Sequence, residues 1–342
     1  AIDAMGGDEG PRVMVAGAAL ARHRHAGFQF LFVGDEAQIR EALKDHPNLS
    51  AASEILHAPD VVSGDDKPGQ ALRNSKTTSM GMAVNAVKTG EVSAAVSAGN
   101  TGALMAIAKL ALRTMPGIDR PALSALLPTM TETDVVMLDL GANTECNSRN
   151  LVQFAVMGAA YSRIMHGFDR PRVKLLNIGT EEAKGTGTIQ EAAATLKNAG
   201  GLHMDFLGFT EADKISTGEV DVIVTDGFSG NVALKALEGT ARFVTDLLKR
   251  SFLSSLRSKI GFLISRPATE MLRDQLDPNN HNGAVFLGLN GVVVKSHGSA
   301  DEKGVANAVE VAARLVEDSI LERISEDLTK ISEAAPVAEV AK

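Results

Sequence analysis

Residues 94–103 read AAVSAGNTGA, a short apolar run that ends in a turn of small and polar residues and leads into a helical pattern. Similar stretches occur at 2–8 (IDAMGGD), 135–145 (VVMLDLGANTE), 174–187 (KLLNIGTEEAKGTG), 222–231 (VIVTDGFSGN) and 292–299 (VVVKSHGS). Strand-like runs that alternate with helical patterns are typical of βαβ units. The sequence therefore predicts an α/β fold, doubly wound and Rossmann-like, around a mainly parallel sheet.

The same alternation can be followed along most of the chain. Strands are expected near 28–33, 53–57, 94–98, 135–140, 173–178, 221–225 and 291–295, and helices near 11–24, 35–45, 76–89, 101–112, 151–165, 187–198 and 231–250. Residues 113–134 contain three prolines and are expected to form an excursion or a domain crossover. Residues 1–325 are predicted to form one α/β catalytic domain, which the length also allows to be two interleaved lobes. From residue 326 no core pattern remains, so residues 326–342 are expected to be a flexible tail.

The bulk composition excludes several classes of protein. Of 342 residues, 44% are hydrophobic and 22% are charged, which is ordinary for a globular protein. The net charge of −8 argues against a nucleic-acid binder. The single cysteine excludes an internal disulfide and is typical of a reducing cytoplasm. No stretch of about 18 or more uncharged apolar residues occurs, so no segment is expected to span a bilayer. We therefore expect a cytoplasmic protein.

Residues 247–269 (LLKRSFLSSLRSKIGFLISRPAT) carry five basic residues and no acidic one, against the sign of the whole protein. An apolar stripe recurs there at helical spacing, formed by Phe252, Leu256, Ile260, Leu263 and Ile264. A protruding amphipathic helical segment is therefore predicted, within a helical excursion at about 240–276. Such a segment is typical of a helix on an anionic membrane surface or against an acidic partner. A helical hairpin in a dimer interface, with solvated lysines and arginines, explains the pattern equally well.

The turns that end the apolar runs are candidates for an anion site. Loops that leave the carboxyl ends of parallel strands share one crevice. Glycines let backbone N–H groups approach a ligand, and the N-termini of the following helices attract negative charge. Residues 97–102 (SAGNTG) and 226–231 (DGFSGN) fit this description, and 297–299 (HGS) close the last strand. Lys184 lies between a strand and a glycine-rich helix start, where it can offer charge to a phosphate or an oxyanion.

Several common catalytic motifs are absent from the sequence. Residues 185–187 (GTG) lack the third glycine of a dinucleotide fingerprint, because Gln190 stands there. Neither a Walker-type loop nor a G-x-S-x-G elbow occurs. A metal is not expected, because the candidate ligands are scattered singly: Asp3, Asp8, Asp139 and Asp226. Donors and an anion pocket without a covalent nucleophile favour a reaction in which the bound anion itself attacks.

Eight motifs occur in order: DAMGGD (3–8), SAGNTGA (97–103), GIDRPAL (117–123), LDLGAN (138–143), LVQFAVMG (151–158), LLNIGTEEAKG (175–185), TDGFSGN (225–231) and LGLNGVVVKSHGS (287–299). Together they resemble the bacterial phosphate acyltransferase family. The resemblance implies a homodimer with a fold similar to that of phosphotransacetylases and isopropylmalate-type dehydrogenases. It implies transfer of a long-chain fatty acyl group from acyl-carrier protein to inorganic phosphate, without a cofactor. It also implies peripheral membrane association and delivery of acyl phosphate to a membrane glycerol-3-phosphate acyltransferase in phospholipid synthesis.

The mechanism expected from the resemblance places phosphate on the backbone N–H groups of residues 97–102 and 229–231, with one phosphate oxygen attacking the thioester carbonyl. The expected catalytic residues are Lys184, Asn231 and Asn143, and an oxyanion donor is worth about 2–4 kcal/mol. The residues expected to bind phosphate or substrate are Asp3, Gly6, Gly7, Asp8, Ser97, Gly99, Asn100, Thr101, Gly102, Asn177, Glu181, Asp226, Gly227, Ser229, Gly230, His297 and Gly298. The residues expected to dock the acidic carrier protein are Arg73, Lys76, Lys249, Arg250, Arg257 and Lys259.

Three other functions fit parts of the sequence. A phosphotransacetylase acting on acyl-CoA shares the fold and the reaction type. A decarboxylating dehydrogenase would need an aspartate cluster and a nicotinamide site, and the sequence indicates neither. A membrane-surface scaffold would bind liposomes through residues 247–269 and catalyse nothing. Because such folds host many activities, the fold alone does not decide among them.

Overall fold

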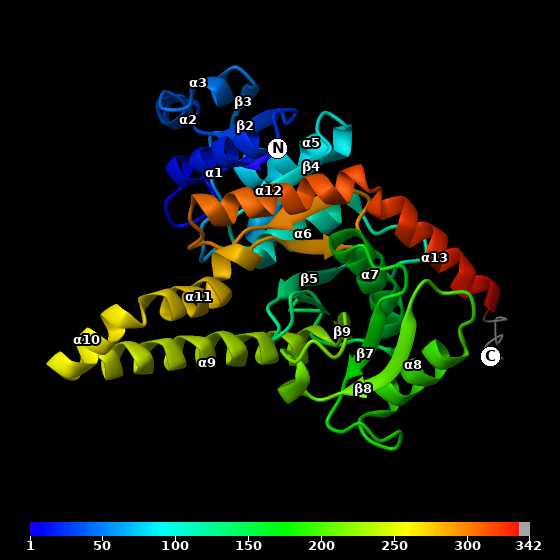
Figure 1. Ribbon diagram of the computed structural model, residues 1–342. Coiled ribbons are helices and arrows are strands. Elements are labelled where there is room, and N and C mark those ends of the chain that lie inside the picture. The colour runs from blue at the N-terminus through cyan, green and yellow to red at the C-terminus, as the bar shows by residue number, and fades with distance from the viewer. Residues whose placement is uncertain (335–342) are drawn as a thin grey trace.

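The computed structural model describes residues 1–334, with side chains to residue 330, and contains one sheet with helices on both faces (Figure 1). The strands are β1 (Ile2–Asp3), β2 (Phe30–Gly34), β3 (Ser53–His57), β4 (Ala94–Ser97), β5 (Ala122–Leu127), β6 (Val135–Leu138), β7 (Arg172–Leu176), β8 (Asp205–Thr210), β9 (Val222–Val224), β10 (Ala284–Leu287) and β11 (Val292–Lys295). The helices are α1 (Pro11–Arg24), α2 (Glu36–Leu43), α3 (Pro47–Ser50), α4 (Pro68–Arg73), α5 (Ser79–Thr89), α6 (Thr101–Leu112), α7 (Ser148–His166), α8 (Gly187–Asn198), α9 (Gly227–Leu253), α10 (Leu256–Ile264), α11 (Arg266–Leu276), α12 (Glu302–Glu317) and α13 (Ile320–Ala334), with the 3-10 helices η1 (Ala212–Lys214) and η2 (Pro278–His281). This architecture confirms the predicted fold class.

The sheet is buried on both faces, which explains why its strands read as continuous apolar runs. Its eleven strands follow the order β3-β2-β1-β4-β11-β10-β5-β6-β9-β7-β8. Successive residues of a strand point to opposite faces. In β11, Val292 and Val294 join the core under α1, α7 and α12, whereas Val293 joins the core under α5 and α6.

The two halves of the sheet run in opposite directions. β3, β2, β1, β4 and β11 are parallel to one another, and so are β6, β9, β7 and β8. Between these sets, β10 and β5 each pair antiparallel with both neighbours. The carboxyl ends of the two parallel sets therefore lie at opposite edges of the sheet. The expectation that all the loops leave from one edge is wrong.

Three strands, β5, β8 and β10, were not among those expected from the sequence. The stretch 113–134, expected to be an excursion, contains β5 in the middle of the sheet. Pro121 directly precedes β5 and Pro128 directly follows it, so these prolines bound the strand without interrupting its hydrogen bonds. β10 is a wholly apolar run of four residues, whose pattern alone does not distinguish a strand from a buried segment of another kind.

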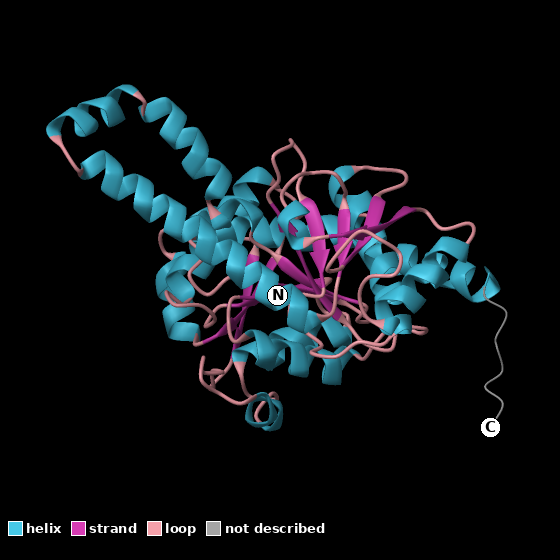
Figure 2. Cartoon of the chain, turned by 90° about the horizontal axis from the view of Figure 1, so that it is seen from below, coloured by secondary structure: helices cyan, strands magenta, loops and turns pink. Residues whose placement is uncertain are grey.

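The helices α9, α10 and α11 form an arm that extends away from the sheet (Figures 1 and 2). Near its start, α9 packs Ala233, Leu234 and Leu237 on the core. Farther out no residue of the arm is buried, and Phe252 meets Phe262 with ring centroids 5.2 Å apart. The arm therefore carries its apolar side chains into solvent in the single chain.

The C-terminal part of the described chain is helical. In α13, Asp327 is buried and its Oδ2 lies 2.6 Å from Nη2 of Arg163 in α7. The expectation of a flexible tail over 326–342 is therefore wrong for residues 326–334, because a buried ion pair anchors that helix. Residues 335–342 lie outside the described residues. Within the part of the chain that the structure describes, no helix is long and apolar enough to cross a membrane.

Candidate functional site

Three loops meet at the carboxyl ends of β1, β4 and β11, and we call residues 3–8, 97–102 and 296–299 the first loop group. Ser97 Oγ donates to Asp3 Oδ2 at 2.6 Å, and the Gly99 N–H donates to Ser97 Oγ at 3.1 Å. The N–H of Asp8 donates to the carbonyl of Gly298 at 2.8 Å. These bonds join Asp3, Asp8, Ser97, Gly99 and Gly298 in one unit, as expected from the sequence.

Close backbone contact is the reason for the glycine in the first of these loops. A Cβ on Gly6 would lie 2.8 Å from the backbone nitrogen of Gly99, so the two loops can touch only where residue 6 has no side chain. Asp3 beside them is fully buried, and burial raises the pKa of its carboxyl while the hydrogen bond from Ser97 acts against this. The group thus combines small residues with a buried acid.

A second set of loops meets at the carboxyl ends of β6, β7 and β9, and we call residues 139–143, 177–185 and 226–231 the second loop group. Its centre is Asp139, which is wholly buried. Its carboxylate accepts hydrogen bonds at 2.7–3.1 Å from the N–H groups of Leu123, Gly141, Ala142 and Asn143. Burial raises the pKa of Asp139, and these hydrogen bonds act against the rise. Asp139 therefore organises the loop that leaves β6.

Two residues expected to contact substrate donate their amide hydrogen bonds within the fold. The Asn143 amide donates to the carbonyl of Pro121 at 2.7 Å and to Asp139 at 2.9 Å, so its two N–H bonds are occupied. The expected role of Asn143 as an oxyanion donor does not fit this arrangement. Asn177 donates to the carbonyl of Lys184 at 3.1 Å and so fixes the loop that carries that lysine.

Lys184 and Asn231 of the second loop group are exposed. The Lys184 ammonium forms no ion pair with any described residue. Asn231 lies in the first turns of α9, which approach the β6 loop so closely that a Cβ on Gly230 would lie 1.9 Å from the carbonyl oxygen of Asp139. Both side chains are thus open to solvent, and their action on substrate stays a prediction.

Helix α9 starts in the second loop group and carries charges that act on the first. It begins in the second group, with Asp226 as its N-cap. One turn beyond Asn231, about 6 Å along the axis, comes Lys235. Burial and Lys295 lower the pKa of His297 in the first group, Glu238 raises it, and Lys235 lowers it further. The loops do not share one sheet edge, but charges on the first turns of α9 act on His297 of the first group.

Several polar residues of this region have structural or electrostatic roles that sequence reasoning did not assign. Asn100 caps α6 by accepting from the Ala103 N–H at 3.0 Å. The N–H groups of Thr101 and Gly102 lie at the start of the helix, so they have no intrahelical partners. Lys235 was not singled out from the sequence, and Lys295 was noted only as lying two residues before His297. Only Lys295 carried a signal, as a charged residue in the otherwise apolar run VVVK.

The residues expected to dock the carrier protein lie on two separate surfaces. Arg73, the last residue of α4, and Lys76 just after that helix are exposed. The Pro68 ring of α4 would lie 3.4 Å from a Cβ on Gly102. They therefore flank the first loop group. The other four, all on the arm, are exposed: Lys249, Arg250, Arg257 and Lys259.

The possible metal ligands and the cysteine of this region can be placed as follows. Residues 1–330 contain no group of three or more His, Cys, Asp or Glu side chains that could hold a metal ion. Cys146 lies half-buried beside the second loop group, with its Sγ 4.0 Å from the carbonyl of Asn143. Burial and the charge of Asp139 raise the pKa of its thiol to about 11, so it is protonated at neutral pH.

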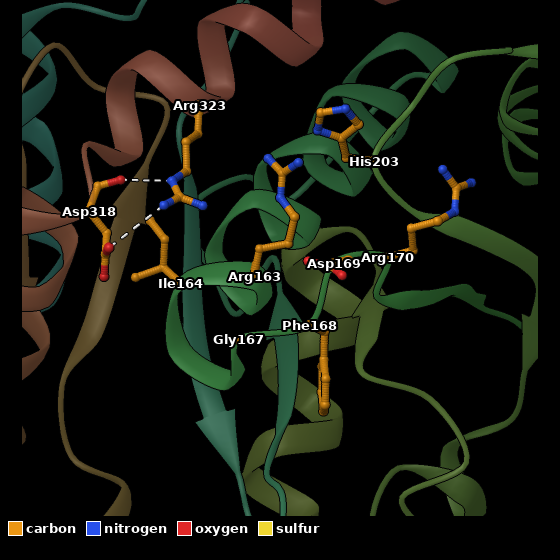
Figure 3. A pocket seen from close by; sticks show the side chains of 9 residues that line it. All are labelled: Arg163, Ile164, Gly167, Phe168, Asp169, Arg170, His203, Asp318 and Arg323. Carbon is orange, nitrogen blue, oxygen red and sulfur yellow. Dashed lines mark hydrogen bonds and ion pairs between the residues drawn. The ribbon is translucent and has the colours of Figure 1, made fainter.

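A cavity of about 670 Å³ lies at the amino end of β7, opposite the end that carries the second loop group (Figure 3). None of the expected site residues lines it. Its arginines are already paired with aspartates: Arg163 with Asp327, Arg170 with Asp205 and Arg323 with Asp318. We assign this cavity to the packing of α13 on α7.

Comparison with known proteins agrees with the motifs. The chain matches the family described as fatty acid synthesis protein over residues 1–323. It is 70% identical to a phosphate acyltransferase of Erythrobacter litoralis over 97% of this chain and 94% of that one. The chain belongs to the phosphate acyltransferase family. A second member, from Rhodospirillum centenum, is 52% identical over 99% of this chain and 95% of its own.

Solved structures outside the family share the fold. A phosphotransacetylase from Streptococcus pyogenes aligns with a TM-score of 0.60 at 19% identity, covering 92% of this chain and 93% of that one. The EutD phosphotransacetylase from Staphylococcus aureus gives 0.52 at 15% identity, covering 89% and 99%. These likenesses place the phosphate acyltransferase family in a phosphotransacetylase-like fold, as the motifs implied.

Proposed function

We propose that this chain transfers a long-chain fatty acyl group from the thioester of acyl-carrier protein to inorganic phosphate, giving acyl phosphate for phospholipid synthesis. The observation that carries the proposal is the 70% identity with a phosphate acyltransferase along nearly the whole chain. Identity of this extent covers both loop groups and the arm. The exposed Lys184 and Asn231 beside glycine-rich loops supply what the reaction requires.

Phosphate binds at the first loop group in this proposal. The unpartnered N–H groups at the start of α6 and the helix dipole attract an anion there. Asn231 and Lys184 face the thioester from the second loop group and stabilise the oxyanion that forms when a phosphate oxygen attacks the carbonyl. The carrier thiolate then leaves, so no covalent enzyme intermediate is needed.

The arm and the surface cations serve partners in this proposal. The exposed apolar and basic side chains of residues 247–269 place the protein on an anionic membrane surface, next to a membrane glycerol-3-phosphate acyltransferase that consumes the product. Arg73 and Lys76, with the basic residues of the arm, steer the acidic carrier protein. The protein acts as a homodimer at the cytoplasmic face of the membrane.

Release of free thiol from long-chain acyl-carrier protein, with and without inorganic phosphate, tests the reaction. We expect release that depends on phosphate, and an acyl phosphate that hydroxylamine traps. A parallel assay with acyl-CoA separates this activity from that of a phosphotransacetylase. No release from either donor would contradict the proposal and favour the membrane-surface scaffold.

A further inference from the structure

Lys295, the last residue of β11, is the buried cation of the first loop group. It is 9% exposed and follows three apolar strand residues, Val292, Val293 and Val294. A lysine at this depth is rarely found unless its charge and its N–H groups have partners. The groups around the Lys295 ammonium therefore indicate what this side chain does.

The Lys295 ammonium joins two loops. It donates to the carbonyl of Ala98 at 3.3 Å and to the carbonyl of Ser296. Ala98 lies in the loop that offers its backbone N–H groups to an anion, and Ser296 directly precedes His297. One side chain thus fixes the relative position of the β4 and β11 loops.

Charges from two other elements act on this ammonium. Asp3 and Asp8, from the β1 loop, favour its charged form, and Lys235 of α9 opposes it. Glu238 forms an ion pair with Lys235 at 3.0 Å, and His297 lies on the same loop as Ser296. Lys295 is the one buried lysine in this set, since Lys235 is exposed.

We propose that Lys295 is a positioning residue for phosphate: it holds residues 97–102 against residues 296–299 in the geometry that binds the anion. This inference rests on the proposed function and assigns the two halves of the site different cations. Lys295 holds the loops that bind phosphate, and Lys184 of the second loop group stabilises the oxyanion formed from the thioester.

The protonation of Lys295 gives a signature that a purely structural lysine would not give. Burial lowers the pKa of Lys295 to about 8, although Asp3 and Asp8 act against this. The ammonium is charged below that pH and loses its charge above it, so phosphate affinity should fall as the pH rises through this range. An arginine in the same place keeps its charge throughout.

Steady-state kinetics of phosphate-dependent thiol release, from about pH 6.5 to 9.5, test the inference on the full chain. Lys295→Met is expected to raise the KM for phosphate about tenfold or more at neutral pH, with the KM for acyl-carrier protein changed less than about twofold. Lys295→Arg is expected to remove the rise in phosphate KM that the wild type shows above about pH 8. Because phosphate itself titrates equally in all samples, the ratio of variant to wild type isolates the lysine.

Lys174→Met is the matched control, because Lys174 is a half-buried strand lysine in β7, outside both loop groups. It should leave both KM values unchanged. If the wild type shows no phosphate-dependent release, the proposed function fails. If the wild type is active and Lys295→Met keeps the phosphate KM, or Lys295→Arg keeps the wild-type pH profile, the positioning role is wrong. Should Lys295→Met unfold, as circular dichroism would show, the pH profile of Lys295→Arg decides alone.

Discussion

Single residues of the second loop group divide into those that hold the loops and those that remain open to a ligand. Asp139 and Asn143 are buried, and their side chains form hydrogen bonds with the backbone and with each other. Lys184 and Asn231 are exposed beside them. A substitution in the first pair should therefore affect stability, and a substitution in the second pair should affect turnover.

Lys184→Ala is expected to lower kcat for phosphate-dependent thiol release by about 100-fold or more, because a lost oxyanion contact costs about 2–4 kcal/mol. Unfolding should be unchanged, since the side chain packs against no core. Lys44→Ala is the control, because Lys44 is an exposed lysine just after α2, outside both loop groups, and its ion pair with Glu41 is exposed. Full turnover by Lys184→Ala with intact folding would remove the central assignment.

Asp139→Asn is expected to lower the free energy of unfolding by about 2–3 kcal/mol, because a neutral amide replaces the carboxylate that accepts several buried N–H groups. Urea unfolding followed by circular dichroism measures this change. Asp226→Asn provides a comparison, since Asn is an equally good N-cap and should keep most of the stability. Equal stability of Asp139→Asn and the wild type would mean that the buried hydrogen bonds do not depend on the charge.

Among the elements, the arm is the one whose exterior does not suit a monomer in water. Ile260 and Leu263 are 54% and 69% exposed on α10 and lie beside Arg257 and Lys259. Apolar and basic side chains on one exposed hairpin are typical of a surface that meets lipid, carrier protein or a second copy of the chain.

The double variant Ile260→Asp, Leu263→Asp is expected to lower binding to phosphatidylglycerol vesicles about tenfold or more, because it replaces inserted apolar groups with negative charge. Flotation measures the bound fraction, and thiol release in solution should persist. Leu110→Asp is the control, because Leu110 is 65% exposed on α6, away from the arm. Unchanged flotation together with a shift to monomer in sedimentation would show instead that the arm forms the dimer interface.

The sequence predicted the arm and most elements because their signals are local. Helical spacing in 247–269 and turns such as 97–102 depend only on neighbouring residues. The reversed direction of the second half of the sheet could not be predicted, because the direction of β6 depends on its antiparallel pairing with β5. The sequence of a short strand does not indicate which strand it pairs with. The candidate loops could be named one by one from the sequence, because their turns are local. The sequence could not show that the Asn143 amide is already hydrogen-bonded or that Lys295 is buried, because both depend on how distant segments pack.

At the scale of the whole molecule, segments that are far apart in the sequence pack against each other and complete the core. α1 near the N-terminus packs against α12 near the C-terminus on one face of the first half of the sheet. α13 continues across to α7 in the second half, where Arg163 and Asp327 form an ion pair that is 8% and 4% exposed. Neither half is therefore a unit that completes its core from one continuous segment.

This closure predicts that the two halves unfold together. Differential scanning calorimetry should show one main transition, and amide exchange should protect β2 and β7 with equal free energies, because the sheet continues through β10 and β5. Asp327→Asn should lower the temperature of that same transition, since breaking one partner of a buried pair costs about 3–5 kcal/mol. Exposed Asp318→Asn, which loses only a 3.6 Å contact with Arg323, should leave it nearly unchanged. Two separate transitions, with Asp327→Asn shifting only one, would instead establish two independently stable lobes, and would mean that β5 and β10 join the halves without coupling them.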